Sequence, residues 1–583
     1  MKNPYSNIRN VKLPSKNDIK LAITHFSKFE WKMFFALLII LLVSTVALLG
    51  KVNQSFMVQV PKTGGSLTEG IIGAPRFVNP ILAISDADKD LSALIYSGLM
   101  RLNDDGTFIP DLAEKYEVSP DGLTYTFTLK DNIYFHNDKP VTVDDVLFTI
   151  NSIKDPTVKS PRKSSWDGVS PEKIDEKTIK FNLKQPYVSF LENTTIGIMP
   201  KDIWSNSHIE LNTANINGIG SGPYMVGSVN KESSGTVKSY DLKYFKKFTL
   251  GKPYIKNITL KFYSNEEDSI VALKSGAVEQ ISSISPMSAE ALKEKGYDID
   301  TSILPRVFGL FFNQNQNQIF TNKNVTQAIS LAINKDRIVN EILKGYGSKI
   351  DNPIPSNIIN YDKLTGTNDA SHEANLEKAK NILSKDGWKI NADGFLEKTI
   401  TEKKAKTTTL LAFSISTSNA PDLTATAEII KQDLEAIGIK VDVKTFESGN
   451  LNQGVIRPRK YDALLFGQII NNESDLFAFW HSSQRVDPGL NIAMYTNSKV
   501  DKILEDAYIT INKESRINKY TQFETEIKKD SPAVFLYSPS LIYIKKENIE
   551  GVNISHVTSP AERWNSVYKW YVDTDNVWKI FTK

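Results

Sequence analysis

The side chains that could perform catalysis in this chain of 583 residues are few and far apart in the sequence. There is no cysteine, which excludes disulfides, cysteine-ligated zinc, iron–sulfur clusters, thiol catalysis and lipid attachment through cysteine. The six histidines include no pair spaced i, i+4, the spacing at which one helix face presents two imidazoles to zinc. No G-x-S-x-G nucleophile motif is present. We therefore predict a protein that is not an enzyme, with no catalytic residue, no bound metal and no cofactor.

Two further patterns resemble known chemistry only superficially. The glycine-rich stretch GIGSG at 218–222 is followed by PYMV, which starts a strand, and no Lys-Ser/Thr pair follows it. A phosphate-binding turn needs a helix N-terminus at that point, so a turn into a strand is the better interpretation. The acidic pairs Asp144/Asp145 and Glu266/Glu267 indicate solvated helix starts. Sequence spacing leaves open a glycosidase whose carboxylates come from distant segments, but nothing supports one.

Both helices and strands are predicted along the chain, and any site would have to be positioned by them. This alternation predicts a mixed α/β fold. Residues 123–130 and 178–184 alternate polar and apolar side chains, as half-buried strands do. Thr142 is a suitable N-cap, with two aspartates in the following first turn, so a helix is predicted after it. Helical spacing of apolar residues also marks 325–333 and 423–438, and a strand is predicted for 439–446.

The overall charge is small but unevenly distributed. Lys and Arg number 70 and Asp and Glu 67, a balance of +3 that excludes a nucleic-acid binder acting through bulk charge. Residues 1–32 alone carry a charge of +5, so the remainder of the chain carries −2. Hydrophobic residues make up 40% of the chain, which excludes a disordered protein.

An apolar segment without a charge, residues 33–50, follows the basic stretch. As a helix it would be about 27 Å long, close to the thickness of a bilayer core. The positive-inside rule places residues 1–32 in the cytoplasm and everything after Gly50 outside the cell membrane. The run exceeds the usual length of a cleaved signal peptide and its exit lacks an A-x-A site, so a retained signal anchor is favoured over cleavage. A linker is expected at 51–61.

The order of short motifs in the remaining chain resembles the solute-binding proteins of peptide/nickel-type ABC importers, family 5. The matching motifs run from NP and IYSGL through PDLAEKYEVSPDGLTYTFTLK and FHNDKPVTVDDV between residues 77 and 150. They continue with GSGPY, ALKSGAVEQ and VTQAISLAINKDRIVNEILKGYG, and end with FWHSSQ, GLNIAMYTNSKVDKILEDA and DSPAVFLYSP. The resemblance covers nearly the whole body after the anchor. One departure is that Ser474-Asp475 replaces the acidic-proline pair typical of peptide binders.

The resemblance implies a two-lobed clamp of the type II periplasmic-binding-protein kind, with an extra α/β domain inserted in the first lobe, closing around its ligand by a hinge motion. The expected boundaries are lobe I at 62–97, 201–305 and 531–583, the inserted domain at 98–200, and lobe II at 306–530.

The same resemblance implies the ligand residues. Asp475 is expected to neutralise the α-ammonium of a peptide, with capping of 476–480 as its alternative role. Arg306 is expected either to pair with a ligand carboxylate or to form a structural salt bridge. Trp480 and Phe466 are candidates for the pocket wall and equally for the core. His481 has no partner histidine nearby, so a metal site there is not expected.

The implied function is that of a monomeric, membrane-tethered subunit that captures oligopeptides and delivers them to an ABC permease and its ATPases. A receptor that binds ligand without feeding a transporter is the alternative. A clamp for another solute, such as a metal chelate or an oligosaccharide, also stays open.

Overall fold

The computed structural model describes residues 15–187, 189–355, 358, 371–402, 405–545 and 548–582, without the side chains of 400–402 and 405. The chain divides into two compact parts. One is formed by Met1–Lys62 together with Asp573–Lys583, and the other by Thr63–Val572. Each is described by itself.

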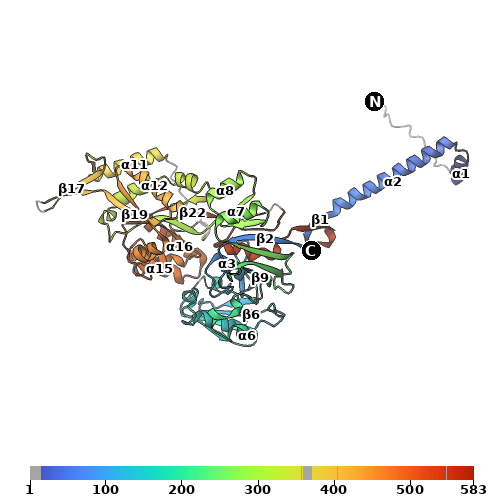
Figure 1. Ribbon diagram of the computed structural model, residues 1–583, viewed down its shortest axis with the longest axis horizontal. Helices are drawn as coiled ribbons and strands as arrows, with labels where there is room; N and C mark the ends of the chain where they lie inside the picture. Colours follow the sequence, from blue (N-terminus) through green and yellow to red (C-terminus); the bar gives the residue numbers. More distant parts are fainter. Residues whose placement is uncertain are drawn as a thin grey trace, which may run out of the picture. The chain divides into compact units, whose positions relative to one another are not determined.

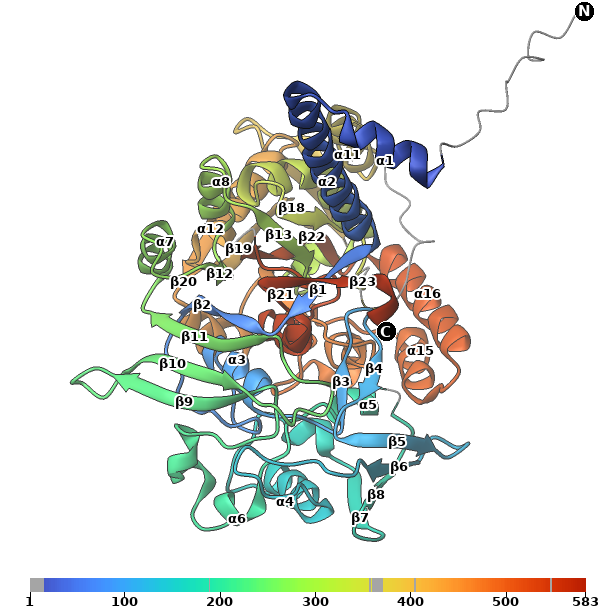
Figure 2. The same cartoon turned by 90° about the vertical axis from the view of Figure 1, so that its right-hand side faces the viewer.

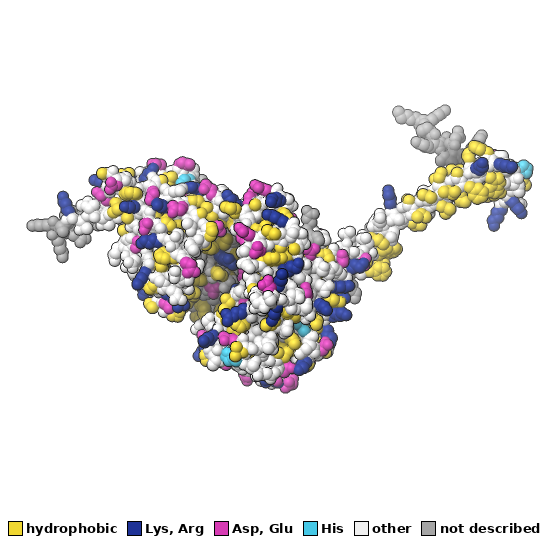
Figure 3. Space-filling view, viewed as in Figure 1, with side chains coloured by type: hydrophobic (Ala, Val, Ile, Leu, Met, Phe, Trp, Pro, Cys, Tyr) yellow, Lys and Arg dark blue, Asp and Glu magenta, His cyan; other side chains and the backbone are white. Residues whose placement is uncertain are grey.

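The first part is built from two helices and a small sheet. Helix α1 (Lys16–Thr24) and helix α2 (Lys28–Phe56) each begin at a serine that forms a capping box with an acidic residue three positions later. Among the described residues α2 is the one helix long and apolar enough to cross a membrane, and Figure 3 shows hydrophobic side chains along it. It is longer than the predicted 33–50 at both ends. The expected linker 51–61 continues α2 to Phe56 and then forms β1 (Met57–Lys62), which pairs antiparallel with β23 (Asp573–Trp578).

The second part is organised by a twelve-stranded sheet. Its order is β20-β19-β21-β14-β22-β12-β2-β11-β10-β9, and β13 and β15 both pair with β22. Figures 1 and 2 show its two regions, with β2, β11, β10 and β9 side by side in one and β19, β20 and β21 in the other. The strands are β2 (Gly64–Ile72), β9 (Tyr224–Lys231), β10 (Val237–Tyr244), β11 (Ile255–Tyr263), β12 (Gln280–Ser282), β13 (Ile299–Ile303), β14 (Arg306–Phe312), β15 (Gly347–Lys349), β19 (Ala412–Ser418), β20 (Lys440–Phe446), β21 (Ala463–Ile469) and β22 (Ala533–Ile544).

Strand β22 joins these two regions. Its first half pairs with β14 and its second half with β12 and β13. Strand β14 is buried on both faces, since Leu310 and Phe312 pack into one apolar cluster while Val307 and Phe311 pack into another. The sequence of a strand that is covered on both faces is nearly continuously apolar, and the sequence of β14, RVFGLFF, has this character.

A separate four-stranded antiparallel sheet lies within residues 113–183. Its order is β5-β6-β8-β7, from β5 (Ala113–Val118), β6 (Thr124–Leu129), β7 (Val169–Lys173) and β8 (Thr178–Leu183). In β6 and β8 alternate residues are buried, which confirms the two strands predicted from alternation. Helix α4 (Val143–Lys154) begins after Thr142, whose backbone N–H and hydroxyl both donate to Asp145 at 2.9 and 2.7 Å. The predicted N-cap is therefore confirmed.

Other sequence predictions are confirmed as well. Helix α9 (Lys323–Ala332) and helix α12 (Pro421–Glu435) lie on the predicted helical segments 325–333 and 423–438, but end one and three residues earlier than predicted. Helix α12 is followed by Gly438 with φ of 86° and then by β20. The GIGSG stretch leads into β9, as predicted. Its glycines allow close packing, because a Cβ at Gly220 would lie 2.1 Å from the carbonyl oxygen of Ile95.

Candidate ligand-binding site

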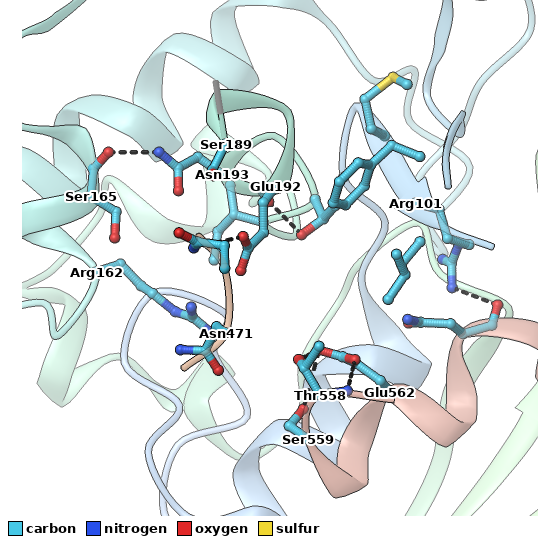
Figure 4. Close-up of a pocket in the computed structure, with 18 of the residues that line it drawn as sticks. Arg101, Arg162, Ser165, Ser189, Glu192, Asn193, Asn471, Thr558, Ser559 and Glu562 are labelled. Carbon is cyan, nitrogen blue, oxygen red and sulfur yellow. Dashed lines mark hydrogen bonds between the residues drawn. The ribbon is translucent and has the colours of Figure 1, made fainter. Parts of the chain in front are cut away.

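A cavity of about 590 Å³ lies within the second part of the chain. Five segments far apart in the sequence line it, and Figure 4 shows side chains from several of them converging. They are α3 (Asp86–Ile95) with β3 (Met100–Leu102), the turn η1 (Lys163–Trp166) with Arg162, residues 187–197 around α5 (Phe190–Asn193), the loop 471–475 with the start of α16 (Lys513–Asp530), and residues 556–565. The volume falls within the range of roughly 300–1,000 Å³ typical of small-molecule sites.

A buried ion network fixes one side of the cavity. Arg563, on the 3-10 helix η8 (Pro560–Lys569), is fully buried and donates to Glu69 of β2 at 2.5 and 3.0 Å and to Asp90 of α3 at 2.7 and 2.8 Å. Gln280 also donates to Glu69, at 2.7 Å. Burial raises the pKa of Glu69 to about 7, against the attraction of Arg563. The network thus ties α3 to η8, and both contribute lining residues.

Two of the cationic residues that line the cavity are already neutralised. Arg101 donates to Asp111 at 2.7 Å, and both side chains are buried. Arg516 donates to both carboxylate oxygens of Glu473, at 2.5 and 3.2 Å. These are structural ion pairs, and they leave neither guanidinium free to neutralise a ligand.

Asp475 lines the cavity and also organises its own loop. Its Oδ2 accepts the backbone N–H groups of Asn471 and Asn472, at 2.8 and 3.4 Å. It is the first residue of the short helix α14 (Asp475–Trp480), but the N-cap is Ser474, and the N–H groups that Asp475 accepts precede the helix. Asp475 therefore has the expected lining position and does not cap 476–480. Burial raises the pKa of Asp475, and the hydrogen bonds from Asn471 and Asn472 lower it in part.

Glu192 and Glu562 bring further negative charge to the same cavity. Glu192, on α5, accepts a hydrogen bond from Asn472 Nδ2 at 2.9 Å. Burial raises the pKa of Glu192 to about 7; the bond from Asn472 opposes this increase, and Asp475 and Glu562 add to it. Glu562 accepts the backbone N–H and the hydroxyl of Thr558, at 2.7 and 2.6 Å, and burial raises its pKa. In the described part of the chain none of the three carboxylates forms an ion pair.

Arg162 supplies charge of the opposite sign. Its side chain extends into the region between Glu192 and Asn471 (Figure 4), and it lines the cavity. Its charge lowers the pKa of Glu192, by less than burial and the charges of Asp475 and Glu562 raise it. Over the described ranges no ion pair neutralises the guanidinium, which stays exposed.

The other three predicted ligand residues do not line this cavity. Trp480 is fully buried in an apolar cluster, 5.7 Å from the ring of Phe535. Phe466 packs at the edge of the same cluster from β21. Arg306 begins β14; burial lowers its pKa, and within the described residues its buried Nε has no hydrogen-bond partner. The structure therefore brings Asp475 to the cavity and places Trp480, Phe466 and Arg306 outside its lining.

His481 is occupied by local contacts. Its ring stacks on Phe477 at 4.2 Å, and its Nδ1 lies 2.8 Å from the hydroxyl of Ser483. Within the described residues, no group of three or more His, Cys, Asp or Glu side chains could hold a metal ion.

Sequence analysis did not identify Glu192, Asn472 or Arg162. Each belongs to a short segment without a regular pattern, and they are brought together only by the tertiary fold. No periodicity or motif marks such residues, because the signal is their convergence.

Comparison with known proteins agrees with this architecture. Residues 107–487 match the model of the bacterial extracellular solute-binding proteins, family 5. The oligopeptide-binding protein AppA of Bacillus subtilis is 28% identical over 522 residues, covering 88% of this chain and 92% of that protein. The structure of that protein with a nonapeptide superposes with a TM-score of 0.67, at 27% identity, over 88% of this chain and 100% of the other.

A second solved structure carries a different ligand. NikZ of Campylobacter jejuni in complex with Ni(L-His) superposes with a TM-score of 0.68 at 26% identity, again over 88% of this chain and 100% of that one. Similar folds thus hold a peptide in one protein and a metal chelate in another. The chain belongs to the bacterial extracellular solute-binding proteins of family 5.

Proposed function

We propose that this chain is the membrane-tethered substrate-binding subunit of an ABC importer and that it captures oligopeptides in the cavity described above. The single observation that carries the proposal is the cavity itself, whose wall combines carboxylates with the guanidinium of Arg162, none of them in an ion pair with another described residue. A peptide with free ends offers both complementary charges. An enzyme is not proposed, because family membership and the lining indicate binding.

Asp475 is proposed to contribute to the negative wall that attracts the ammonium group of the peptide. Its position in the lining supports this, and among the described residues no ion pair with a protein cation involves it. We also propose the lobe boundaries that the family resemblance implies. Lobe I comprises residues 62–97, 201–305 and 531–583, the inserted domain residues 98–200, and lobe II residues 306–530. The continuity of β22 through both regions of the large sheet is compatible with a hinge between them.

The membrane topology is part of the proposal. Helix α2 supplies an apolar segment of sufficient length, and the basic residues before it favour a cytoplasmic N-terminus. The body would then lie outside the membrane as a monomer, held near a permease and its ATPases. A retained anchor predicts that the mature protein still contains 33–50, which intact-mass measurement tests.

Equilibrium dialysis of the full chain in detergent tests the ligand class. The probes are pools of unblocked peptides of two to nine residues, Ni(L-His) and a pool of oligosaccharides, with the retained molecules identified by mass spectrometry. Retention of peptides supports the proposal. Retention of the chelate or of a sugar without any peptide would refute the peptide assignment and favour the alternative solute.

An uptake assay in cells distinguishes a subunit that feeds a transporter from a receptor that does not. Deletion of the gene should abolish uptake of a retained peptide, and expression of the full chain should restore it. Unchanged uptake together with confirmed binding would favour a receptor that feeds no transporter.

A further inference from the structure

Strand β23 brings a distant segment of the chain back to the end of the apolar helix α2. Strand β1 follows α2 directly and runs away from it, and β23 is antiparallel to β1, so β23 runs back towards the helix. Its last residue, Trp578, pairs with Met57, and the indole Nε1 donates to Oδ1 of Asn53 on α2 at 2.8 Å. The segment 578–581, which includes the 3-10 helix η9 (Lys579–Phe581), therefore begins beside the end of α2, as Figures 1 and 2 both show.

Large apolar side chains are exposed at this end of the ribbon that β1 and β23 form. Trp578 is 44% exposed, and Ile580 and Phe581 are 77% and 75% exposed. Phe56, the last residue of α2, is 59% exposed. Figure 3 shows hydrophobic side chains gathered there. Such a group exceeds the scattered single apolar residues that are normal on a surface facing water, so it marks an interaction surface.

The length of α2 places these side chains at the surface of the membrane. The uncharged segment 33–50 is long enough for the hydrocarbon core, and α2 continues through 51–56. That continuation adds about 9 Å of helix, slightly more than the roughly 5–8 Å depth of one headgroup layer. Asn53, the partner of Trp578, lies halfway along it. Tryptophan is enriched at this depth of a bilayer, because its ring is apolar while its N–H is polar.

The charges of the ribbon are also unevenly distributed along its length. Asp573 and Asp575 lie in the half of β23 far from α2, where Asp575 pairs with Lys62 at 3.5 Å. The end beside α2 carries Lys51 and Lys579. Basic side chains near a bilayer are attracted to anionic lipid headgroups, whereas the carboxylates of this ribbon are held away from them.

We propose that Trp578, Ile580 and Phe581 insert into the outer surface of the bilayer beside α2 and form a second membrane contact of this chain. This inference rests on the proposed membrane topology and goes beyond it. Lipid is the partner, and not a second copy of the chain, because the apolar group directly adjoins the membrane-spanning helix and reaches the bilayer without any association. Held there, the ribbon connects the second part of the chain to the membrane through two strands in place of one.

The chain contains no cysteine, so a single introduced cysteine can carry a fluorescent label. Full chains with Ile580→Cys or Thr574→Cys are labelled with nitrobenzoxadiazole and reconstituted in vesicles of phosphatidylcholine and phosphatidylglycerol. Thr574 is exposed near the far end of β23. Nitroxide groups on the lipid headgroups should quench the label at 580 at least about threefold more than the label at 574, since only the former reaches the interface. Equal quenching at the two positions would overturn the inference.

Further variants test whether the apolar side chains cause the contact. With the label on Thr582→Cys, adding Ile580→Ser and Phe581→Ser should lower the quenching to that of the control position on β23. The matched control, Val271→Ser with Met287→Ser, removes two exposed apolar side chains from the second part of the chain and should leave the quenching unchanged. Circular dichroism checks that each variant is folded. Unchanged quenching after Ile580→Ser and Phe581→Ser would refute the role of these side chains and overturn the inference.

A label within the span separates this inference from the proposed topology. The label on Val46→Cys should be quenched by nitroxides on the acyl chains. Quenching at 46 without quenching at 580 overturns the inference and leaves the anchor, whereas no quenching at 46 overturns the membrane topology and the inference together. A label at 580 whose emission changes with protein concentration, and not with lipid, would assign the apolar group to a second copy of the chain and overturn the lipid contact. Dialysis of the same labelled chains with the peptide pool tests ligand capture independently.

Discussion

Replacing Arg563 by methionine tests whether the buried ion network holds the elements beside the cavity. The substitution removes the cation and keeps a long apolar side chain, so Glu69 and Asp90 stay buried and face each other without compensation. Breaking a buried ion pair costs about 3–5 kcal/mol. For a unit of about 510 residues, with an unfolding entropy of about 2.1 cal/mol/K per residue, 4 kcal/mol lowers the Tm by about 4 °C.

The sign of the pH dependence follows from the pKa of Glu69. Because burial raises that pKa to about 7, the folded protein binds more protons than the unfolded chain between about pH 4.5 and 7. Stability from this group is therefore present at low pH and is lost as the pH rises through that window. Without Arg563 the pKa rises further, so the cost of Arg563→Met should be larger at pH 8 than at pH 5.

Denaturant unfolding followed by circular dichroism measures how far Arg563→Met lowers the free energy of unfolding in two backgrounds. In the wild type we expect the full 3–5 kcal/mol. In the Glu69→Gln, Asp90→Asn background, where no charge is left to compensate, the same substitution should cost less than about 1.5 kcal/mol. Arg457→Met is the exposed control and should cost less than about 0.5 kcal/mol. An equal cost of Arg563→Met in both backgrounds would refute the assignment of the network.

Three further predictions concern the core and the ligand. Trp480→Ala should lower the free energy of unfolding by about 3–5 kcal/mol in denaturant titrations, because the ring is fully buried among aromatic residues, and unchanged stability would contradict that placement. Asp475→Asn should weaken binding of unblocked peptides by roughly threefold to tenfold in calorimetric titrations, because it removes one carboxylate from the cavity lining; unchanged affinity would refute its contribution. Peptide affinity should rise as the pH increases from 5 to 7, by up to roughly tenfold per unit, because the pKa of Glu192, which Asp475, Glu562 and Arg162 face, is about 7 and a cation needs its ionised form. The rise should end near pH 8, where the α-ammonium of the peptide itself loses its proton. A flat profile in Glu192→Gln is the control, and a flat profile in the wild type would show that Glu192 does not meet the cation.

The elements with local signals were predictable from the sequence. The alternation in β6, the N-cap of α4 and the helix–strand connection at Gly438 each depend on neighbouring residues, and each was found where expected. The apolar anchor helix was also predicted, but its bounds were too short because the polar residues at its ends continue the same helix.

The cavity was much less predictable. Its lining comes from segments nearly five hundred residues apart, and no local pattern encodes that convergence. The apolar character of Trp480 fits both a core and a pocket wall, and only its complete burial distinguishes the two. Asp475 was identified through the family resemblance, whereas Glu192 and Arg162 needed the tertiary structure.

The most direct test of the account is a crystal structure of the chain with a tripeptide retained in the dialysis experiment. The account predicts density for the peptide inside the cavity, with its ammonium nitrogen about 2.7–2.9 Å from an oxygen of one of the lining carboxylates, Asp475, Glu192 or Glu562. A peptide bound elsewhere on the molecule, with the cavity free of it, would contradict the central claim that this cavity is the ligand site.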